Sequence, residues 1–406
     1  MEQQELIPHL FRTEYRKIAA VLCKLFGLEN MQLAEDIASD TFLLASEVWS
    51  LKGLPENPTA WLYTVAKNKT KDYLKRNALF QNEIAQNIKR SSSPEIEIDL
   101  SDKNIFDSQL QMMFAICHPD ISAEAQIGLS LRILCGFGID EIADAFLTNR
   151  ETINKRLFRA KEKLRTEKVR IEFPNEAEIS NRLETVLTTL YLLFNEGYYS
   201  SSQHNTLRKD LCLEAMRLTH LLLENKATNQ PYVNALFALM CFQSSRFEAR
   251  TTKNGETVLY HYQDSKLWNE ELITKGEHYL NLASKGDRIS KYHLEAGIAY
   301  WHTQQKDTKE KWENILQLYN RLLQIEYSPI VALNRTYALS KANGKAAAIA
   351  EAEKLNLNSN HFYYTLLGEL YKDMDNQKAK ENFLKALSLA KTQTDKQTIQ
   401  TKIDGL

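Results

Sequence analysis

The sequence is poor in the two residues that most often punctuate turns. Glycine (13) and proline (8) together make up 21 of 406 residues, about 5% against an average near 12%. This shortage excludes a collagen-like or low-complexity chain and argues against a turn-rich β-sandwich. We therefore expect an all-α protein, and at about 150 residues per domain the length suggests two to three domains.

Cysteine is scarce, and long apolar runs are missing. The five cysteines are scattered and contain no C-x-x-C spacing, so we expect reduced thiols in a cytoplasmic protein rather than a disulfide framework, a zinc site or any other cofactor. Residues 1–26 lack a basic segment followed by an apolar core, which argues against a signal peptide. The longest apolar run, Ala235–Phe242, is far short of the ~20 residues that span a bilayer. No membrane association is expected.

An excess of charge of either sign is also absent. The 51 Lys and Arg residues balance 52 Asp and Glu residues, which excludes a uniformly basic coat of the histone kind. Any nucleic-acid site must therefore be a local feature of the chain. Apolar residues at 43% and charged residues at 25% are enough to build and solvate several packed cores.

Apolar periodicity predicts three helices at the N-terminal end, at about residues 5–26, 30–49 and 57–76. Gly27 is a plausible stop for the first, and Asn57-Pro58 has the form of an N-cap followed by an N1 proline. The second helix has an acidic outer face, which we expect to be exposed, made of Glu35, Asp36, Asp40 and Glu47. Residues 80–104 turn polar and then acidic around Ser91–Pro94, which makes them the best linker candidate.

The third helix has a basic ridge. Between Lys67 and Arg76 there are five basic residues and one acid, Asp72, and Lys67, Lys71 and Lys75 follow at four-residue spacing. Like charges stacked in this way repel, and a bound polyanion would remove that cost and release counterions. The alternative is a lysine face that is merely solvated.

A second basic helix follows a short helix and a tight turn. Residues 139–146 predict the short helix, 147–149 the turn and 150–165 the longer helix, with Ile153, Leu157, Ala160 and Leu164 facing inward. The opposite face carries Glu151, Thr152, Lys155, Arg156 and Arg159, with Arg150 at the start. This pattern is typical of a helix-turn-helix, whose second helix enters the DNA major groove. An ordinary helical hairpin with a charged outer face is the alternative.

From Glu178 onward we expect about ten helices separated by short polar turns. Tyr364, Leu367, Gly368 and Tyr371, followed by Ala379, Phe383 and Ala386, have tetratricopeptide-like (TPR-like) spacing. In residues 194–198, we expect Gly197 to end a helix in the left-handed conformation. Asn195 and Glu196 would then hydrogen-bond Arg208 or Arg217 as a buried polar network, beside Tyr198, or would contact the N-terminal domains.

Three segments in this order resemble the extracytoplasmic-function (ECF) group of bacterial sigma factors: residues 33–42, residues 57–72 and residues 139–165. Residues 114–119, residues 191–198 and the pattern around Arg208–Arg217 resemble an ECF subgroup with a long C-terminal TPR-like extension. The resemblance covers nearly the whole chain. It implies a region-two domain at 1–79, a linker at 80–109, a region-four helix-turn-helix domain at 110–170 and a TPR-like domain at 178–406.

The resemblance also implies partners and roles. Core RNA polymerase would be bound through its β′ clamp helices and β flap, with Glu35, Asp36, Asp40 and Glu47 on the clamp helices. The loop at residues 50–55 and the third helix would engage the melted minus-ten element of promoter DNA, through Trp61, Lys67, Asn68, Lys71, Lys75 and Arg76. The minus-thirty-five element would be contacted by Arg150, Glu151, Thr152, Lys155, Arg156 and Arg159. Lysines stand where relatives often have arginines in the third helix, and lysine lacks the bidentate geometry of arginine.

The extension would pack on the sigma domains or the polymerase and tune activity. An enzyme is not expected, because the nine histidines form no paired ligand spacing and Gly136-Phe137-Gly138 is too short for a phosphate loop. The rival interpretation is a helix-turn-helix regulator or scaffold whose TPR-like part binds peptides, with no polymerase role.

Overall fold

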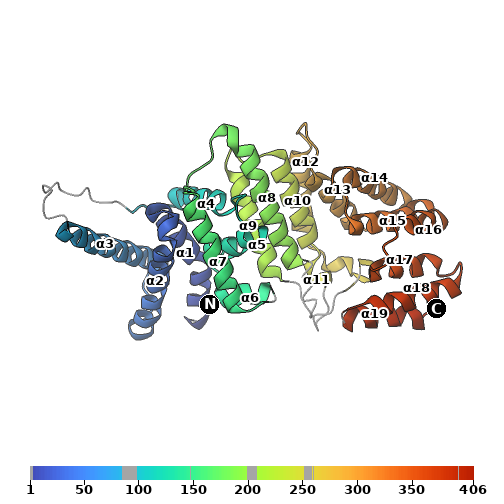
Figure 1. The fold of residues 1–406 in the computed structure, drawn as a ribbon, viewed down its shortest axis with the longest axis horizontal. Coiled ribbons are helices and arrows are strands. Elements are labelled where there is room, and N and C mark those ends of the chain that lie inside the picture. Colours follow the sequence, from blue (N-terminus) through green and yellow to red (C-terminus); the bar gives the residue numbers. More distant parts are fainter. Residues whose placement is uncertain are drawn as a thin grey trace. The chain divides into compact units, whose positions relative to one another are not determined.

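The computed structural model describes residues 3–84, 98–146, 148–198, 208–250, 258, 260–391 and 393–406. These residues form nineteen α-helices with short 3₁₀ and π turns and no strand (Figure 1). The predicted all-α fold is confirmed. Within these ranges, no helix is long and apolar enough to cross a bilayer. The chain divides into two compact units, unit 1 (Met1–Glu196) and unit 2 (Gly197–Leu406).

Unit 1 contains eight α-helices among its described residues. Their bounds are α1 (Gln3–Phe26), α2 (Met31–Lys52), α3 (Pro58–Ile84), α4 (Asp102–Ile116), α5 (Ala123–Leu129), α6 (Ile139–Ala145), α7 (Arg150–Thr166) and α8 (Glu176–Tyr198), with short turns η1 (Leu28–Asn30) and η2 (Ser130–Leu134). The last residues of α8 pass into unit 2.

The first three helices begin and end close to the predicted positions. Gly27 ends α1 with a φ of +80°, where its N–H donates to the Cys23 carbonyl at 2.8 Å. The Asn57 side chain caps α3 by accepting from the Ala60 N–H at 2.9 Å. Gly53, at φ +81°, ends α2 later than predicted, so the loop to α3 spans residues 53–57. The α3 helix also continues eight residues past the predicted end at Arg76.

The predicted linker at 80–109 overlaps the end of α3 and the start of α4. Residues 85–97, which include the Ser91–Pro94 stretch, lie outside the described residues. The Ser101 hydroxyl caps α4 by accepting from the Asn104 N–H. The domain borders at 79 and 110 therefore stay predictions.

Helix α8 packs into unit 1. The Thr189 hydroxyl donates to the Gln126 side chain of α5, both groups being buried, and Arg182 donates to the Phe114 carbonyl of α4. Leu183 and Leu190 are fully buried in the same helix. The predicted border at residue 178 falls inside α8, so a deletion that starts there removes part of the core of unit 1.

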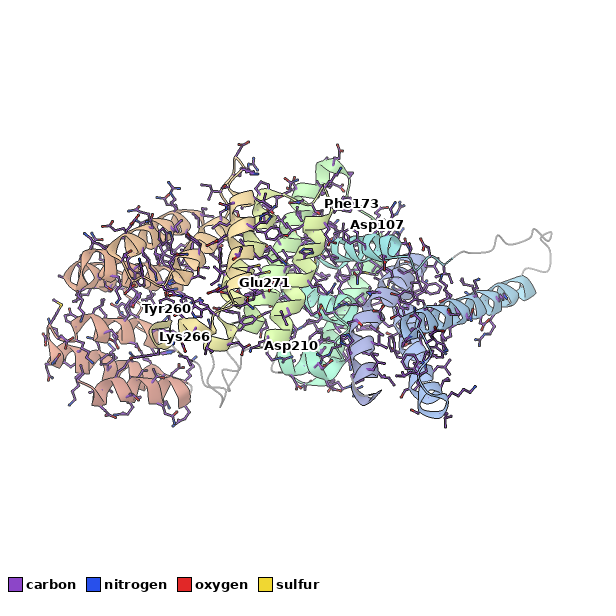
Figure 2. All side chains as sticks on the ribbon, turned by 180° about the vertical axis from the view of Figure 1, so that it is seen from behind. Asp107, Phe173, Asp210, Tyr260, Lys266 and Glu271 are labelled. Atoms are coloured by element: carbon purple, nitrogen blue, oxygen red, sulfur yellow. The ribbon has the colours of Figure 1, made fainter. Side chains whose placement is uncertain are left out.

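Unit 2 is a succession of helices that pack on their neighbours along the chain. The bounds are α9 (Lys209–Glu224), α10 (Pro231–Ser244), α11 (Phe247–Arg250), α12 (Glu270–Ala283), α13 (Lys291–Thr303), α14 (Lys309–Ile325), α15 (Pro329–Asn343), α16 (Lys345–Lys354), α17 (His361–Tyr371), α18 (Asn376–Leu389) and α19 (Gln393–Asp404). Side chains fill the space between neighbouring helices, with Asp210 in α9 and Glu271 in α12 labelled in Figure 2. One apolar cluster joins α13–α15, and another joins α15–α19.

The residues with TPR-like spacing lie in the hairpin of α17 and α18. Tyr364, Leu367, Ala379, Phe383 and Ala386 are buried there. A Cβ on Gly368 would lie 2.5 Å from the Phe383 ring, so the absence of a side chain lets the two helices approach closely. The close approach is the physical content of the small residue at this position.

We expect Gly368→Ala to destabilise unit 2 by about 1–3 kcal/mol, because the added methyl group overlaps a ring that has no free space to move into. Chemical denaturation of the full chain, followed by circular dichroism, measures the change. Lys380→Ala, at an exposed position of α18, serves as control and should change stability by no more than about 0.5 kcal/mol. Equal effects of the two substitutions would contradict the packing described.

Candidate polymerase and nucleic-acid interfaces

One face of α2 combines acids with exposed apolar side chains. Asp36, Asp40 and Glu47 are exposed, as predicted. Leu43 is 61% exposed and Leu51 is 86% exposed. Leu43, Glu47 and Leu51 follow at four-residue spacing, so they lie on one side of the helix. Sequence reasoning missed the two leucines, although their spacing from Glu47 was available. Exposed leucines flanked by acids form a surface that can bury apolar area against a basic partner.

Glu35 corrects the prediction of an acidic face made of four exposed residues. Its side chain is buried, with 4% of the residue exposed. Lys161 Nζ of α7 lies 3.0 Å and 3.1 Å from its two carboxylate oxygens, and Arg132 Nε lies 3.8 Å from one of them. Glu35 lies on the side of α2 that meets η2 and α7, where basic side chains offset the cost of burying a carboxylate.

The basic ridge of α3 is largely solvent-facing. Lys71, Lys75, Arg76 and Asn68 are exposed, and Lys67 is half-buried. Lys69, which lies beside the ridge, places its Nζ 3.6 Å from Asp40 Oδ2 of α2. At the start of the helix, half-buried Trp61 packs edge-on against buried Trp49, with ring centroids 5.3 Å apart. The helix therefore presents a row of cations beside a partly exposed aromatic ring, a combination that suits unpaired bases and their phosphates.

Helices α6 and α7 are joined by a short turn, in which Leu147 lies outside the described residues. The Asn149 side chain caps α7 by accepting from the Thr152 N–H at 2.8 Å. The predicted inner face is confirmed, because Ile153, Leu157, Ala160 and Leu164 are all buried. Ile142 of α6 is fully buried as well. The apolar spacing thus sets which side of α7 is turned to solvent.

The outer face of α7 has exposed charges with loose internal pairing. Lys155 Nζ lies 2.6 Å from Glu151 one turn earlier, and Arg150 lies 3.6 Å from Asp140 of α6. Arg159 is exposed, and Thr152 is half-buried. Exposed pairs of this kind contribute little to stability, so these side chains are available to another polyanion.

Arg156 departs from the predicted outer face. It is half-buried, and its guanidinium carbon lies 5.3 Å from the centroid of the Phe146 ring. Its Nη1 atom is buried without a hydrogen-bond partner in the described part of the chain. Stacking on Phe146 draws this arginine toward the turn that links α6 to α7. Arg156 therefore supports the turn more directly than it faces solvent.

We expect Asn149→Ala to lower the free energy of unfolding by about 1 kcal/mol, because the first turn of α7 loses its side-chain cap. Thermal denaturation of the full chain, monitored by circular dichroism, reports the change. The matched control is Asn154→Ala at an exposed position inside the same helix, where alanine is the better helix former. A control that destabilises as much as Asn149→Ala would contradict the role of the cap.

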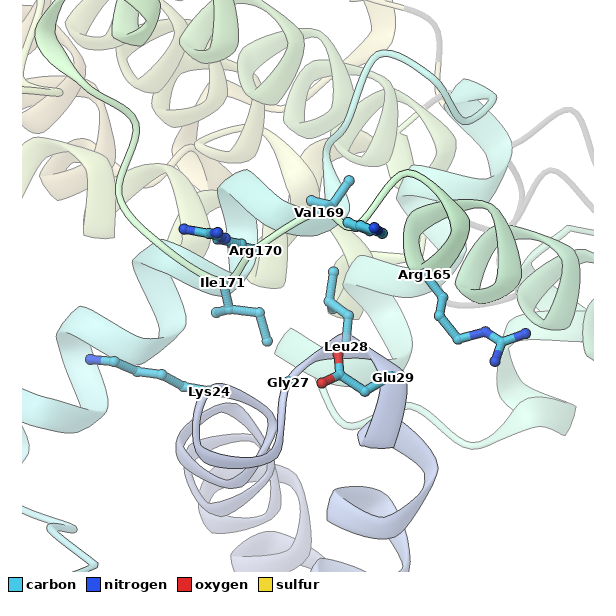
Figure 3. A pocket seen from close by; sticks show the side chains of 9 residues that line it. Lys24, Gly27, Leu28, Glu29, Arg165, Val169, Arg170 and Ile171 are labelled. Atoms are coloured by element: carbon cyan, nitrogen blue, oxygen red, sulfur yellow. The ribbon is translucent and has the colours of Figure 1, made fainter.

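A pocket of about 430 Å³ lies where the end of α1 and η1 face the segment after α7 (Figure 3). Leu28, Val169 and Ile171 line it with apolar groups, while Lys24 and Arg165 extend away from each other at opposite sides. The Lys24 ammonium lies 3.5 Å from the Asn104 side chain. The pocket belongs to the contact between residues 3–84 and the rest of unit 1.

The segment around Gly197 differs from the prediction. Gly197 lies inside α8, and its φ is not among the positive values of the described residues, so the predicted left-handed cap is wrong. Its carbonyl accepts from the Arg208 N–H at 3.0 Å, and a Cβ there would lie 2.7 Å from the Arg208 carbonyl oxygen. Glycine is needed because the start of α9 approaches α8 this closely.

The two arginines of this motif pair with nearby acids. Arg208 bonds Asp210 at 2.9 Å, and Arg217 bonds Glu214 at 2.7 Å. Tyr198 is buried, and the Arg250 guanidinium carbon lies 3.9 Å from the centroid of its ring. Burial raises the pKa of Glu196. The hydrogen bonds predicted for Asn195 and Glu196 stay predictions.

Comparison with known proteins connects these surfaces to a family. Residues 10–79, which span most of α1–α3, match sigma-70 region 2, and residues 182–284 match a family of unknown function, DUF6596. The uncharacterized protein R00370 of Rhizobium meliloti (strain 1021) is 33% identical over 385 residues, which cover 93% of this chain and 90% of that protein. No solved structure matches the chain significantly. The chain therefore belongs to the family of that Rhizobium meliloti protein, and its region-2 domain supports a place in the sigma-70 superfamily.

Proposed function

We propose that this protein is an ECF-type sigma factor that binds core RNA polymerase and directs promoter-specific initiation. The observation that carries the proposal is the match of residues 10–79 to sigma-70 region 2, in a domain that has an acidic and apolar face on α2 and a basic ridge on α3. The two faces suit two different partners, one protein and one nucleic acid. A rival regulator that binds only duplex DNA leaves the α2 face without a role.

In this proposal α2 docks on the β′ clamp helices through Asp36, Asp40, Glu47, Leu43 and Leu51. The acids steer the encounter with a basic surface, and the two exposed leucines supply the apolar contact that lowers the dissociation rate. Glu35 is omitted because it is buried against α7.

The loop at residues 53–57 and α3 engage the melted minus-ten element. Stacking of unpaired bases on an aromatic ring such as Trp61 offsets part of the melting cost, and Lys71, Lys75 and Arg76 hold backbone phosphates. No side chain needs to act on a covalent bond, because polymerase carries out the chemistry.

Helix α7 takes the role of the recognition helix for the minus-thirty-five element, and contact with the β flap belongs to the same region-four domain. Its capped N-terminal end carries Arg150, Glu151 and Lys155, followed by Arg159 one turn further on. Recognition helices contact base edges mainly through their N-terminal residues. Arginine and lysine in these positions can bond guanine edges or phosphates.

Unit 2, as a TPR-like extension, modulates this activity by contact with the sigma domains or polymerase. The support is its succession of paired helices, whose exposed surfaces are typical of proteins that bind other proteins. A chain that ends at Tyr198 keeps α8 whole and removes the remainder. A changed rate of promoter-specific transcription by this shortened chain supports modulation, and an unchanged rate contradicts it.

The proposal is tested by a genome-wide footprint of the protein together with polymerase, followed by run-off transcription from the recovered DNA. Purified full-length chain and core enzyme should produce a transcript that starts at one position downstream of the footprint. Recovery of duplex sites without any dependence on core enzyme would favour the rival helix-turn-helix regulator.

A further inference from the structure

Glu35 and Lys161 join two parts of unit 1 that are more than a hundred residues apart in the sequence. Lys161 Nζ contacts both oxygens of the Glu35 carboxylate, at 3.0 Å and 3.1 Å, and Arg132 approaches the same group at 3.8 Å. Glu35 is buried, and the two basic side chains are mostly covered. We call these three residues the latch. Loss of one member leaves a buried charge without its partner, which is strongly unfavourable.

Other contacts reinforce the same closed arrangement of residues 3–84 against residues 98–196. Arg12 of α1 pairs with Glu141 of α6 at 3.0 Å. The Arg132 guanidinium carbon lies 5.8 Å from the centroid of the Tyr15 ring, and burial raises the pKa of Tyr15 to about 12. Helix α2, the proposed polymerase-binding helix, is thereby tied to α7, the proposed minus-thirty-five helix.

The latch limits how far apart α3 and α7 can be. Helices rise about 1.5 Å per residue, and each side-chain bond adds at most about 1.5 Å. A path through two ion pairs connects the two DNA-binding helices: Lys155, Lys161, Glu35, Asp40, Lys69 and Lys71. Along this path the Cα atoms of Lys155 and Lys71 are at most about 50 Å apart.

Promoter geometry demands a greater separation. The minus-ten and minus-thirty-five elements lie about 25 base pairs apart, which at about 3.4 Å per base pair is roughly 85 Å of duplex. Even with both lysine side chains fully extended, which adds roughly 12 Å, the latched unit falls short. It can meet either element, but it cannot bridge both.

We propose that the structure is a closed state of the sigma domains, held by the Glu35–Lys161–Arg132 latch, which must open before the protein bridges a promoter. This inference rests on the proposed function. Asp36, Leu43 and Glu47 on α2, and Lys155 and Arg159 on α7, stay exposed in the closed state. Docking on polymerase or contact with a single element can therefore precede opening, and the latch blocks only the simultaneous use of both elements.

The test measures the distance between α2 and α7 in the full-length chain. Spin labels at Lys52→Cys and Thr166→Cys, both exposed positions, are selective because the five native cysteines are buried. In the closed state the labelled Cα atoms lie within about 50 Å. Pulsed electron paramagnetic resonance should give one short population for the parent chain and a broader, longer distribution for Lys161→Glu.

Two further variants separate the latch from general damage. Glu35→Gln leaves α7 intact and should also lengthen the distance, while Glu35→Lys/Lys161→Glu restores an opposite-charge pair and should return the short population. Distances that are the same in the parent chain, Lys161→Glu and Glu35→Gln would overturn the latch, whatever the polymerase result.

The gating role has its own measurement. At limiting polymerase, Glu35→Gln should raise run-off transcription from a two-element promoter several-fold, because less binding free energy is used to open the chain. Binding to DNA that carries only the minus-thirty-five element should change less than twofold. No gain in transcription, despite longer distances, would overturn the gating role. Absence of any complex between the parent chain and core polymerase would instead overturn the proposed function, and the distance measurement would still decide the latch.

Discussion

Reversing two acids on α2, as Asp36→Lys/Glu47→Lys, should weaken binding to core RNA polymerase by about 100-fold or more. Both side chains are exposed on the face that carries Leu43 and Leu51, and like charges placed opposite each other in an interface cost several kcal/mol. A fluorescence titration of labelled full-length chain with core enzyme measures the dissociation constant. The fold of the variant should stay intact, because neither acid belongs to the latch.

The matched control is Glu184→Lys/Glu381→Lys, which changes net charge by the same amount at exposed positions of α8 and α18. It should bind core enzyme within about threefold of the parent chain, because non-specific charge effects are screened at physiological salt. If the two variants lose affinity equally, net charge rather than the α2 face controls the association.

Removing two cations from the outer face of α7, as Lys155→Ala/Arg159→Ala, should lower transcription from a promoter that depends on its minus-thirty-five element by about 10- to 100-fold. Each lost base or phosphate contact is worth about 1–3 kcal/mol. Affinity for core enzyme should not change, because the substituted residues lie outside the α2 face. Run-off transcription and the core titration, carried out on the same preparations, separate the two effects.

The same helix offers a control with an equal loss of charge. Lys163→Ala/Arg165→Ala removes two exposed cations from the last turns of α7, where they pair with Glu167 and Glu162. Recognition helices meet bases mainly through their N-terminal residues, so this variant should retain transcription within about threefold. A loss as large as that of Lys155→Ala/Arg159→Ala would contradict the assignment of the DNA-facing surface.

Features within one helix were predictable from the sequence. The apolar period of α7 places Ile153, Leu157 and Leu164 inside, because 3.6 residues per turn determine which side chains share a face. Gly27 and Asn57 also act as predicted at helix ends. In each case the cause lies within a few residues of the effect.

Features that depend on packing between distant segments were not predictable in this way. Glu35 has the same spacing as the exposed acids of α2, but its partner Lys161 lies 126 residues away. Arg156 is drawn inward by Phe146, and Gly197 stays helical because α9 approaches it. No periodic pattern in one helix reveals which neighbour will cover its side.

The central claim is that the protein works as a sigma factor, and its most direct test is the association of the purified full-length chain with core RNA polymerase. Analytical gel filtration of the mixture should give a one-to-one complex that resists competition by promoter duplex alone. Binding of promoter duplex by the free chain, with no complex at any concentration of core enzyme, would contradict it.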